Sequence, residues 1–298
     1  MSDRRIVVVV NPASGHGAAR KHLPTIEKAV HESLPNHPDV IISQSAKHIQ
    51  DLAAQAVRDK VDIFAICGGD GSAHYALQPL VHTPTALAIL PIGSGNDLAM
   101  NAGIPSDFTA ALQLLTRGVP RSIDVAKTQS GFYGCIGGIG FDSEVTRRAN
   151  NRNGWIRGAA LYPFAIVTTL ISFRPRAARI RWDGGQSFEE PIMFAVFANA
   201  ASYGRGIRIA PKAKLDDGWL DVCIVKAMSK AELIRTYPKA YKGTHVNHPK
   251  LVQFRAQSIS IEADEPLELY GDGEFMESTP VEIQVVPKAL HVIVPPHS

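Results

Sequence analysis

The sequence has few cysteines and no apolar run long enough to cross a membrane. Its three cysteines stand singly in apolar stretches, without the spacing of a metal site, so we expect buried free thiols in a reducing compartment. The longest apolar run, residues 158–173, contains Pro163 and falls short of the roughly 20 residues that span a bilayer. We therefore predict a packed helix there and no transmembrane span, with a lipid-facing amphipathic segment as the alternative.

An excess of one charge is also missing. The formal net charge is only +3, so nucleic acid is not an expected partner. Apolar residues make up 45% and charged residues 20% of the chain, which is typical of a folded globular protein. The N-terminus lacks the apolar core of a signal peptide, which favours a cytoplasmic protein. A length of 298 residues predicts two domains.

Several familiar motifs are absent. The sequence contains no P-loop G-x-x-x-x-G-K-[ST] and no complete dinucleotide-binding G-x-G-x-x-G. It also lacks the G-x-S-x-G nucleophile elbow and the zinc-binding H-E-x-x-H. These absences disfavour P-loop enzymes, the common dehydrogenases, serine hydrolases of that type and zinc proteases.

The first part of the chain alternates strand and helix patterns. A β-branched run at residues 6–10 and further apolar strands at residues 63–67 and 86–90 alternate with helical stretches such as residues 18–34. This alternation predicts an α/β domain with a parallel sheet over residues 1–125. Short strands separated by turns, among them residues 132–136, 192–198, 281–286 and 291–294, then predict a β-rich, sandwich-like domain over residues 126–298, whose last residues could pack back on the first domain.

Three loops in the first domain carry glycine, hydroxyl and amide or carboxylate groups. They are residues 11–15 (Asn-Pro-Ala-Ser-Gly), 68–72 (Gly-Gly-Asp-Gly-Ser) and 93–97 (Gly-Ser-Gly-Asn-Asp). Each follows a predicted strand, and such carboxyl ends meet at one edge of a parallel sheet. Glycine backbone before a helix is suited to phosphate, and a carboxylate such as Asp70 to Mg²⁺. Tight turns and helix capping by Asn96 or Asp97 are the structural alternatives. The pattern favours a phosphotransferase.

The order and spacing of these loops resemble the diacylglycerol kinase catalytic-domain family, which includes bacterial lipid kinases, sphingosine kinases and ceramide kinases. The resembling runs are N-P-x-S-G, G-G-D-G-[ST] and P-x-G-[ST]-x-N-D-x-A. Similarity continues with P-x-A-x-x-D-D-G-x-L-D at residues 211–221 and D-G-E at residues 272–274. The G-G-D-G run alone is shared with NAD kinases.

The resemblance implies an ATP site, a Mg²⁺ site and a catalytic base. Its nucleotide-site residues would be Asn11, Ser14, Gly15, Ser43, Gly68, Gly69, Asp70, Gly71, Ser72, Ser94 and Asp124. Glu274 would be the general base, with Asp97 and Asp70 as further catalytic residues. Lys214, Asp217 and Trp219 would hold a structural Mg²⁺, Lys214 and Trp219 through backbone carbonyls. The alternatives are a solvent-exposed hairpin carboxylate for Glu274 and an ordinary turn for Asp217.

We therefore expect an ATP-dependent lipid kinase acting on diacylglycerol or a related lipid. An NAD kinase-like phosphotransferase and a non-catalytic nucleotide-binding regulator are the alternatives. Eight arginines and no acidic residue lie between Arg147 and Arg181, which indicates peripheral contact with the inner membrane surface. A solvated basic face or ion pairs with the other domain would explain them equally well. The oligomeric state stays open, a dimer included.

Overall fold

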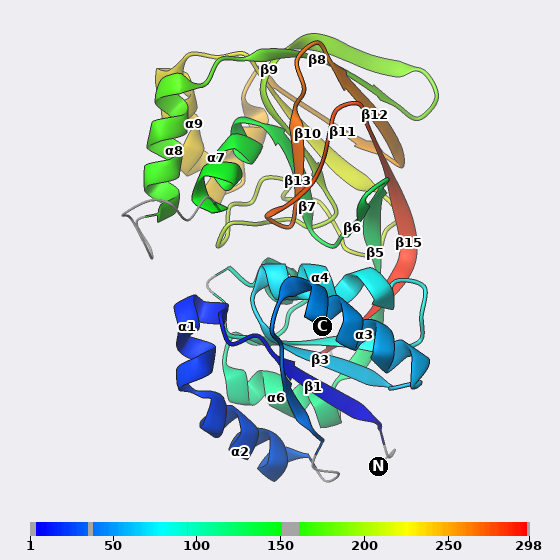
Figure 1. Cartoon of the computed structure of the whole chain (residues 1–298). Coiled ribbons are helices and arrows are strands. Elements are labelled where there is room, and N and C mark those ends of the chain that lie inside the picture. Colours follow the sequence, from blue (N-terminus) through cyan, green and yellow to red (C-terminus); the bar gives the residue numbers. More distant parts are fainter. Residues whose placement is uncertain (1–3, 35–37, 94, 151–160, 297–298) are drawn as a thin grey trace. The chain divides into compact units, whose positions relative to one another are not determined.

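The computed structural model describes residues 4–34, 38–93, 95–150 and 161–296 (Figure 1). The chain divides into two compact units. Unit 1 consists of residues 1–125 and 287–298, and unit 2 consists of residues 126–286. The chain therefore leaves unit 1 once and returns to it after completing unit 2.

Unit 1 contains the predicted parallel sheet. Its strands, in spatial order, are β2 (Val40–Ile42), β1 (Ile6–Val10), β3 (Ile63–Gly68) and β4 (Ala86–Pro91). Every residue of β3 and β4 is buried, as expected for strands covered on both faces. The far end of β15 (Val281–Val294) extends this sheet, with Val292 opposite Leu87.

Helices cover both faces of this sheet. They are α1 (Ser14–Lys21), α2 (Leu23–Ser33), α3 (Ala46–Arg58), α4 (Asp70–Leu80), α5 (Asp97–Asn101) and α6 (Phe108–Arg117). Figure 1 shows α3 and α4 packed together on the opposite side of the sheet from α6. The single helix predicted over residues 18–34 is wrong, because α1 ends before His22 and α2 begins after it. Pro24, in the first turn of α2, cannot continue a preceding helix.

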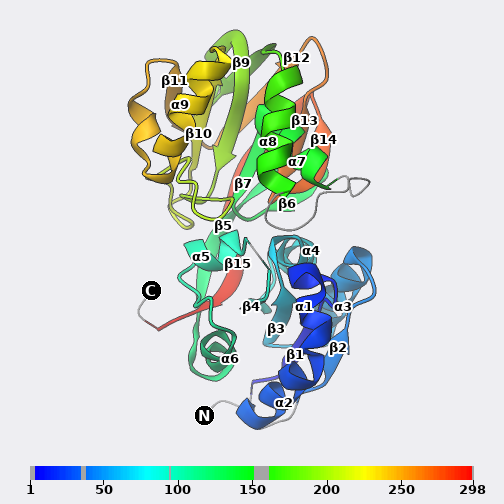
Figure 2. The same ribbon diagram turned by 90° about the vertical axis from the view of Figure 1, so that its left-hand side faces the viewer.

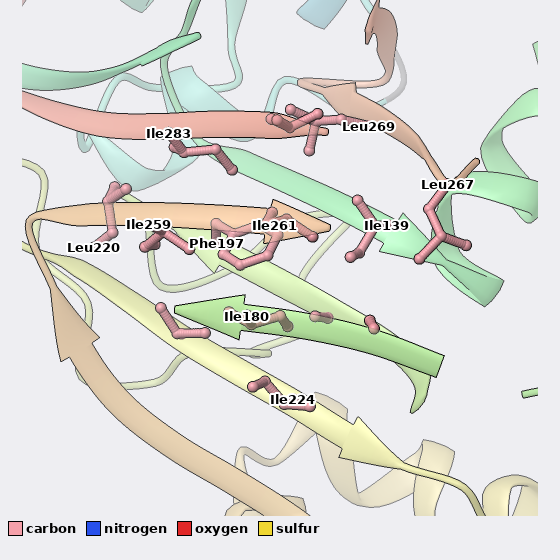
Figure 3. Packing of buried hydrophobic residues seen from close by; sticks show 14 of the residues in the cluster. Ile139, Ile180, Phe197, Leu220, Ile224, Ile259, Ile261, Leu267, Leu269 and Ile283 are labelled. Carbon is pink, nitrogen blue, oxygen red and sulfur yellow. The ribbon is translucent and has the colours of Figure 1, made fainter. Parts of the chain in front are cut away.

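Unit 2 is antiparallel and β-rich, as predicted. Its strands are β6 (Gly131–Tyr133), β7 (Ile136–Gly140), β8 (Arg176–Trp182), β9 (Gln186–Ala198), β10 (Leu220–Lys226), β11 (Leu251–Ala256), β12 (Ser258–Ala263), β13 (Glu268–Gly271), β14 (Glu274–Ser278) and the start of β15. Strand β9 pairs with β8 along its first half and with β7 along its second half. Buried side chains such as Ile180, Phe197 and Ile261 form the core (Figure 3).

The elements of unit 2 differ from the sequence prediction in several places. A strand predicted over residues 132–136 is instead β6 and β7, separated by Gly134 and Cys135. Strands predicted at residues 281–286 and 291–294 are one continuous strand, β15. Strand β14 and helix α7 (Phe141–Asn150) were not predicted.

Within the described residues of unit 2, three α-helices accompany the strands: α7, α8 (Leu161–Ser172) and α9 (Lys230–Tyr241). Figure 2 shows all three on the same side of these strands. Over the part of the chain that the structure describes, no helix has the length and apolar character needed to cross a membrane. The three cysteines are buried free thiols, and burial raises the pKa of Cys67 to about 12.

Candidate active site

The first two strands of unit 1 end in residues that are tied to their neighbours by backbone hydrogen bonds. The Asn11 amide donates to the carbonyl of Cys67 on β3 at 3.0 Å. The Ser43 amide donates to the carbonyl of Val10 at 2.9 Å, and the buried Ser43 hydroxyl donates to the same oxygen at 3.2 Å. The loops after β1, β2 and β3 therefore meet at one edge of the sheet.

A small group of polar side chains lies at this edge. The Asn11 side-chain amide donates to the Ser72 hydroxyl at 2.9 Å, and the Ser14 hydroxyl lies 3.4 Å from the same oxygen. A Cβ on Gly68 would lie only 2.5 Å from the Ser72 side chain, so no larger residue fits there. Gly15 adopts a φ of +60°, which favours glycine at the start of α1. This edge of the sheet thus combines hydroxyl groups with glycine backbone that a ligand can approach closely.

Two glycine loops touch through their backbones. A Cβ on Gly93 would lie 2.5 Å from the Cα of Gly69. The carbonyl of Gly68 accepts hydrogen bonds from the amides of Ile92 at 3.0 Å and Gly93 at 3.3 Å. No described side chain caps the N-terminus of α4 at Gly69, so its first N–H groups, including that of Gly71, are suited to an anion.

Asp70 organises the second of these loops. Its carboxylate accepts hydrogen bonds from the amides of Asn96, at 2.7 Å, and Asp97. Asn96 has a φ of +58° and donates its side-chain amide to the Gly93 carbonyl at 2.8 Å. Its side chain does not cap α5, so that alternative is excluded for Asn96. Its buried Oδ1 has no hydrogen-bond partner among the described residues, which fits a donor from a bound molecule.

The remaining predicted residues of unit 1 have different surroundings. Asp97 is half-buried in the first turn of α5. Asp124, on β5 (Val119–Thr128), is fully buried, and its carboxylate accepts a hydrogen bond from the Lys288 amide at 2.7 Å. Ser94 lies outside the described residues. The structure therefore brings the loop residues and Asp70 together. The hydrogen bond given above for Asp124 joins it to Lys288 on β15.

Glu274 lies in unit 2 on a firmly held hairpin. Asp272 and Gly273 form the turn between β13 and β14, and Glu274 is the half-buried first residue of β14, opposite Gly271. The Asp272 carboxylate accepts hydrogen bonds from the amides of Gly134 at 2.7 Å, Cys135 at 2.8 Å and Ile136 at 3.3 Å. No role for the Asp272 side chain was predicted from the sequence, although an Asp-Gly turn indicates a carboxylate that accepts backbone N–H groups.

The carboxylate proposed for a structural metal already has a cationic partner. The carboxylate of Asp217 accepts from the Trp219 amide at 3.3 Å and is paired with the Arg255 guanidinium. The same guanidinium lies 5.4 Å from the centroid of the Trp219 ring and 3.7 Å from the Asp221 carboxylate. No group of three or more His, Cys, Asp or Glu side chains suited to a metal occurs within the described ranges.

Unit 2 also contains a buried carboxyl that the sequence analysis did not single out. Asp142, in the first turn of α7, accepts a hydrogen bond from the Tyr203 hydroxyl at 2.7 Å. Burial raises the pKa of Asp142 to about 6, although the Tyr203 hydrogen bond acts in the opposite direction. Gly138 leaves space for this carboxylate, since a Cβ there would lie 2.7 Å from Asp142 Oδ2.

The described residues thus form an α/β unit with a parallel sheet, followed by an antiparallel β-rich unit. Two family profiles match the sequence. Residues 5–128 match the diacylglycerol kinase catalytic domain, and residues 136–294 match the YegS C-terminal NAD kinase beta sandwich-like domain. The chain belongs to the diacylglycerol kinase catalytic-domain family.

Individual relatives agree with this membership. A diacylglycerol kinase of Mycobacterium tuberculosis is 34% identical over 302 residues, covering 98% of this chain and 96% of the relative. A diacylglycerol kinase of Bacillus subtilis is 29% identical over 300 residues, covering 98% and 97%. The crystal structure of a diacylglycerol kinase from Bacillus anthracis has a TM-score of 0.76, covers 100% of this chain and 99% of that one, and shares the fold at 24% identity. The chain is an ATP-dependent lipid kinase.

Proposed function

We propose that this lipid kinase transfers the γ-phosphate of Mg-ATP to the hydroxyl of diacylglycerol or a closely related lipid. The observation that carries the proposal is the contact between the Gly69 and Gly93 backbones, which joins two loops beside the N-terminus of α4. Phosphoryl transfer requires positioning and charge neutralisation more than covalent chemistry, and a backbone surface of this kind supplies both.

The proposed phosphate donor site lies in unit 1. Asn11, Ser14 and Ser72 already share hydrogen bonds, and their polar groups would exchange these for bonds to phosphate oxygens. The first N–H groups of α4 would add to the binding of the triphosphate. Ser43 supports the strand end beside them, and the roles of Ser94 and Asp124 in nucleotide binding stay proposals.

Magnesium fits the oxygen donors at this edge. Two carboxylates lie beside Gly95, since a Cβ there would be 2.2 Å from Asp70 Oδ2 and 3.9 Å from Asp97 Oδ2. Carboxylate and phosphate oxygens are the ligands that Mg²⁺ prefers. Asp97, with Asp70 beside it, would hold the ion, which neutralises charge on the transferred phosphoryl group when bound.

A separate structural Mg²⁺ at Lys214, Asp217 and Trp219 stays a weaker proposal. Asp217 offers the only carboxylate of this set, and Arg255 already neutralises it. An ion there would have to share that carboxylate with the guanidinium. We derive no catalytic step from this set.

The proposed acceptor chemistry lies in unit 2. Glu274 would accept the proton of the lipid hydroxyl as the oxygen attacks the γ-phosphorus, and the phosphate bond to ADP would break. Three backbone hydrogen bonds to Asp272 hold the hairpin that carries Glu274. Asp272 is therefore a proposed positioning residue for the base.

The basic segment between Arg147 and Arg181 is a weaker basis for membrane contact than its composition indicated. Arg179 is paired with Glu189 at 2.6 Å and Glu262 at 3.1 Å, and Arg181 with Glu262 at 3.2 Å. Arg152 and Arg157 lie outside the described residues. Peripheral membrane contact therefore cannot rest on Arg179 and Arg181.

An acceptor screen tests the proposed function. Purified protein would be incubated with Mg²⁺ and γ-labelled ATP in the presence of diacylglycerol, phosphatidylglycerol, ceramide, sphingosine, monoacylglycerol or NAD. We expect label in the lipid extract, strongest with diacylglycerol. Label in NAD would contradict the lipid assignment, and ATP binding without transfer to any acceptor would indicate a regulator instead.

A further inference from the structure

Helix α8 buries small or polar side chains and exposes apolar ones. Ala165 and Thr169 are buried at 2% and 1% exposure, and the Thr169 hydroxyl has no hydrogen-bond partner among the described residues. On its outer side, Phe164, Val167 and Ile171 are 50%, 55% and 71% exposed. Their spacing of three and four residues places them on one helix face. A helix facing water shows the reverse arrangement.

Helix α9 repeats this inversion. Thr236 and Ala240 are its buried residues, whereas Ile234, Tyr237 and Tyr241 are 58%, 36% and 46% exposed. The spacing from residue 234 to 237 to 241 again describes one helix face. Two successive reversed helices are harder to explain as scattered surface hydrophobics than one would be.

The two exposed faces are joined at one point. The Lys230 ammonium donates to the carbonyl of Ile171, which connects the start of α9 to the end of α8. Ile234 lies one turn after Lys230 on the same face of α9. Figures 1 and 2 show both helices on the same side of the unit 2 strands. The exposed residues of the two helices adjoin at this contact, and we call them together the helical docking face: Phe164, Val167, Ile171, Lys230, Ile234, Tyr237 and Tyr241.

Basic side chains outnumber acidic ones on the two helices. Helix α8 contains no charged residue, and the only acidic residue of α9, Glu232, is paired with Lys250 at 2.8 Å, whereas Lys230, Arg235 and Lys239 are exposed. Near Ile171, the Arg148 guanidinium donates to the Ser172 hydroxyl at 2.8 Å and lies 3.9 Å from the Glu144 carboxylate. Arg174, two residues further on, is exposed and lines a cavity that also contains Asp264 and Glu265. Apolar side chains with an excess of basic neighbours complement the boundary between acyl chains and anionic headgroups.

We propose that the helical docking face binds the surface of a bilayer that contains anionic phospholipids. This proposal rests on the proposed function, because a diacylglycerol acceptor resides in a bilayer. Ile171, Ile234 and their apolar neighbours insert between headgroups, and Lys230 and Arg174 contact lipid phosphates. The charge contribution therefore comes from the ends of α8 and α9, and not from the paired arginines of β8.

Vesicle sedimentation tests this proposal without ATP or diacylglycerol, so its outcome is independent of the acceptor. The full chain would be mixed with phosphatidylcholine vesicles that contain or lack phosphatidylglycerol. We expect the double variant Ile171→Ser/Ile234→Ser to bind the anionic vesicles about tenfold or more weakly. Arg174→Gln should weaken binding about fivefold at low salt. Val119→Ser, at a 40% exposed valine of unit 1, is the matched control and should bind like the unaltered chain.

Two further measurements separate the possible failures. The double variant should retain its thermal midpoint and still phosphorylate a short-chain, water-soluble diacylglycerol, because the substitutions leave the proposed catalytic residues intact. Unchanged binding of the double variant to anionic vesicles overturns the proposal. The proposal is also overturned if the unaltered chain sediments as a dimer, the double variant sediments as a monomer, and the double variant still binds vesicles. The face would then be an interface between two copies of the chain.

Discussion

The loop edge of unit 1 and the hairpin of unit 2 achieve close positioning by different means. At the loop edge, glycines allow backbone to touch backbone, as Gly69 and Gly93 do. On the hairpin, the Asp272 carboxylate fixes the turn by accepting three amides. The backbone contact of the loop edge is suited to the phosphates of ATP, which are the same in every ATP-dependent reaction. The hairpin positions one carboxylate, that of Glu274, which could act on one particular acceptor.

Of the substitutions considered for the two units, we expect Glu274→Gln to lower activity most. If unit 2 supplies the base, Glu274→Gln should lower kcat by about 10²–10⁴-fold while ATP affinity is retained. Steady-state kinetics with diacylglycerol, together with ATP titration, would measure both quantities. Glu277→Gln on the same strand is the matched control and should change kcat little. Equal turnover by Glu274→Gln and the unaltered chain would show that Glu274 is not the catalytic base.

A smaller effect is expected where the two loops of unit 1 touch. Gly93→Ala places a Cβ 2.5 Å from Gly69 Cα and 2.7 Å from Asn96 Oδ1, so the loops must separate. ATP affinity should fall about 10–100-fold, equivalent to about 1.4–2.8 kcal/mol, as titration would show. Gly184→Ala is the control, because Gly184 has a φ of +77° with open space around it. Its substitution should cost about 1 kcal/mol of stability and leave ATP binding unchanged. Normal ATP affinity in Gly93→Ala would contradict the backbone contact.

The buried carboxyl of unit 2 predicts a pH dependence. The pKa of Asp142 is raised to about 6, so folding favours its neutral form, and ionisation in the folded state is unfavourable. Its contribution to the free energy of unfolding is therefore largest below pH 4 and declines up to about pH 6. Asp142→Asn should gain stability relative to the unaltered chain over this window, by at most about 3 kcal/mol.

Urea unfolding at a series of pH values would measure this difference. Asp264→Asn, at an exposed position, is the control and should follow the unaltered chain at every pH. A constant difference between Asp142→Asn and the unaltered chain from pH 4 to pH 7 would contradict the raised pKa.

Helix caps should give the smallest effect and should not distinguish the units. Ser45 in unit 1 accepts a hydrogen bond from the His48 amide at 3.1 Å, and Ser229 in unit 2 accepts one from the Glu232 amide at 3.2 Å. Ser45→Ala and Ser229→Ala should each lower the free energy of unfolding by about 1 kcal/mol, measured by urea titration. A much larger loss in one of them would show that its cap has a role beyond the helix it begins.

The sequence predicted unit 1 more closely than unit 2 for a physical reason. Parallel strands buried on both faces read as unbroken apolar runs, and backbone contact demands glycine, so both features are visible in the residues. Strand β14 was missed because its pattern is reversed, with Phe275 54% exposed and Met276 buried. Strand β15 was divided at Pro287 and Lys288, yet it continues because the Asp124 carboxylate binds the Lys288 amide, a contact distant in sequence.

The candidate site shows the same division. The loop residues could be found from glycine spacing, and the resemblance pointed to Glu274. The pairing of Asp217 with Arg255 and the burial of Asp142 beside Tyr203 depend on residues far apart in the chain. No local pattern records such partners. The reversed faces of α8 and α9 also required the structure, because a sequence shows the apolar stripe without showing which way it faces.

The return of the chain to unit 1 has a consequence for biosynthesis. Strand β4 gains its neighbour β15, and Asp124 gains the Lys288 amide, only after residues 126–286 have been made. At about 5–20 residues per second, a ribosome needs about 8–30 s to synthesise that intervening segment. During this interval the edge of β4 is unpaired, a condition in which strands associate with other chains. Nascent unit 1 is therefore the part of this protein for which we expect chaperone protection to matter most.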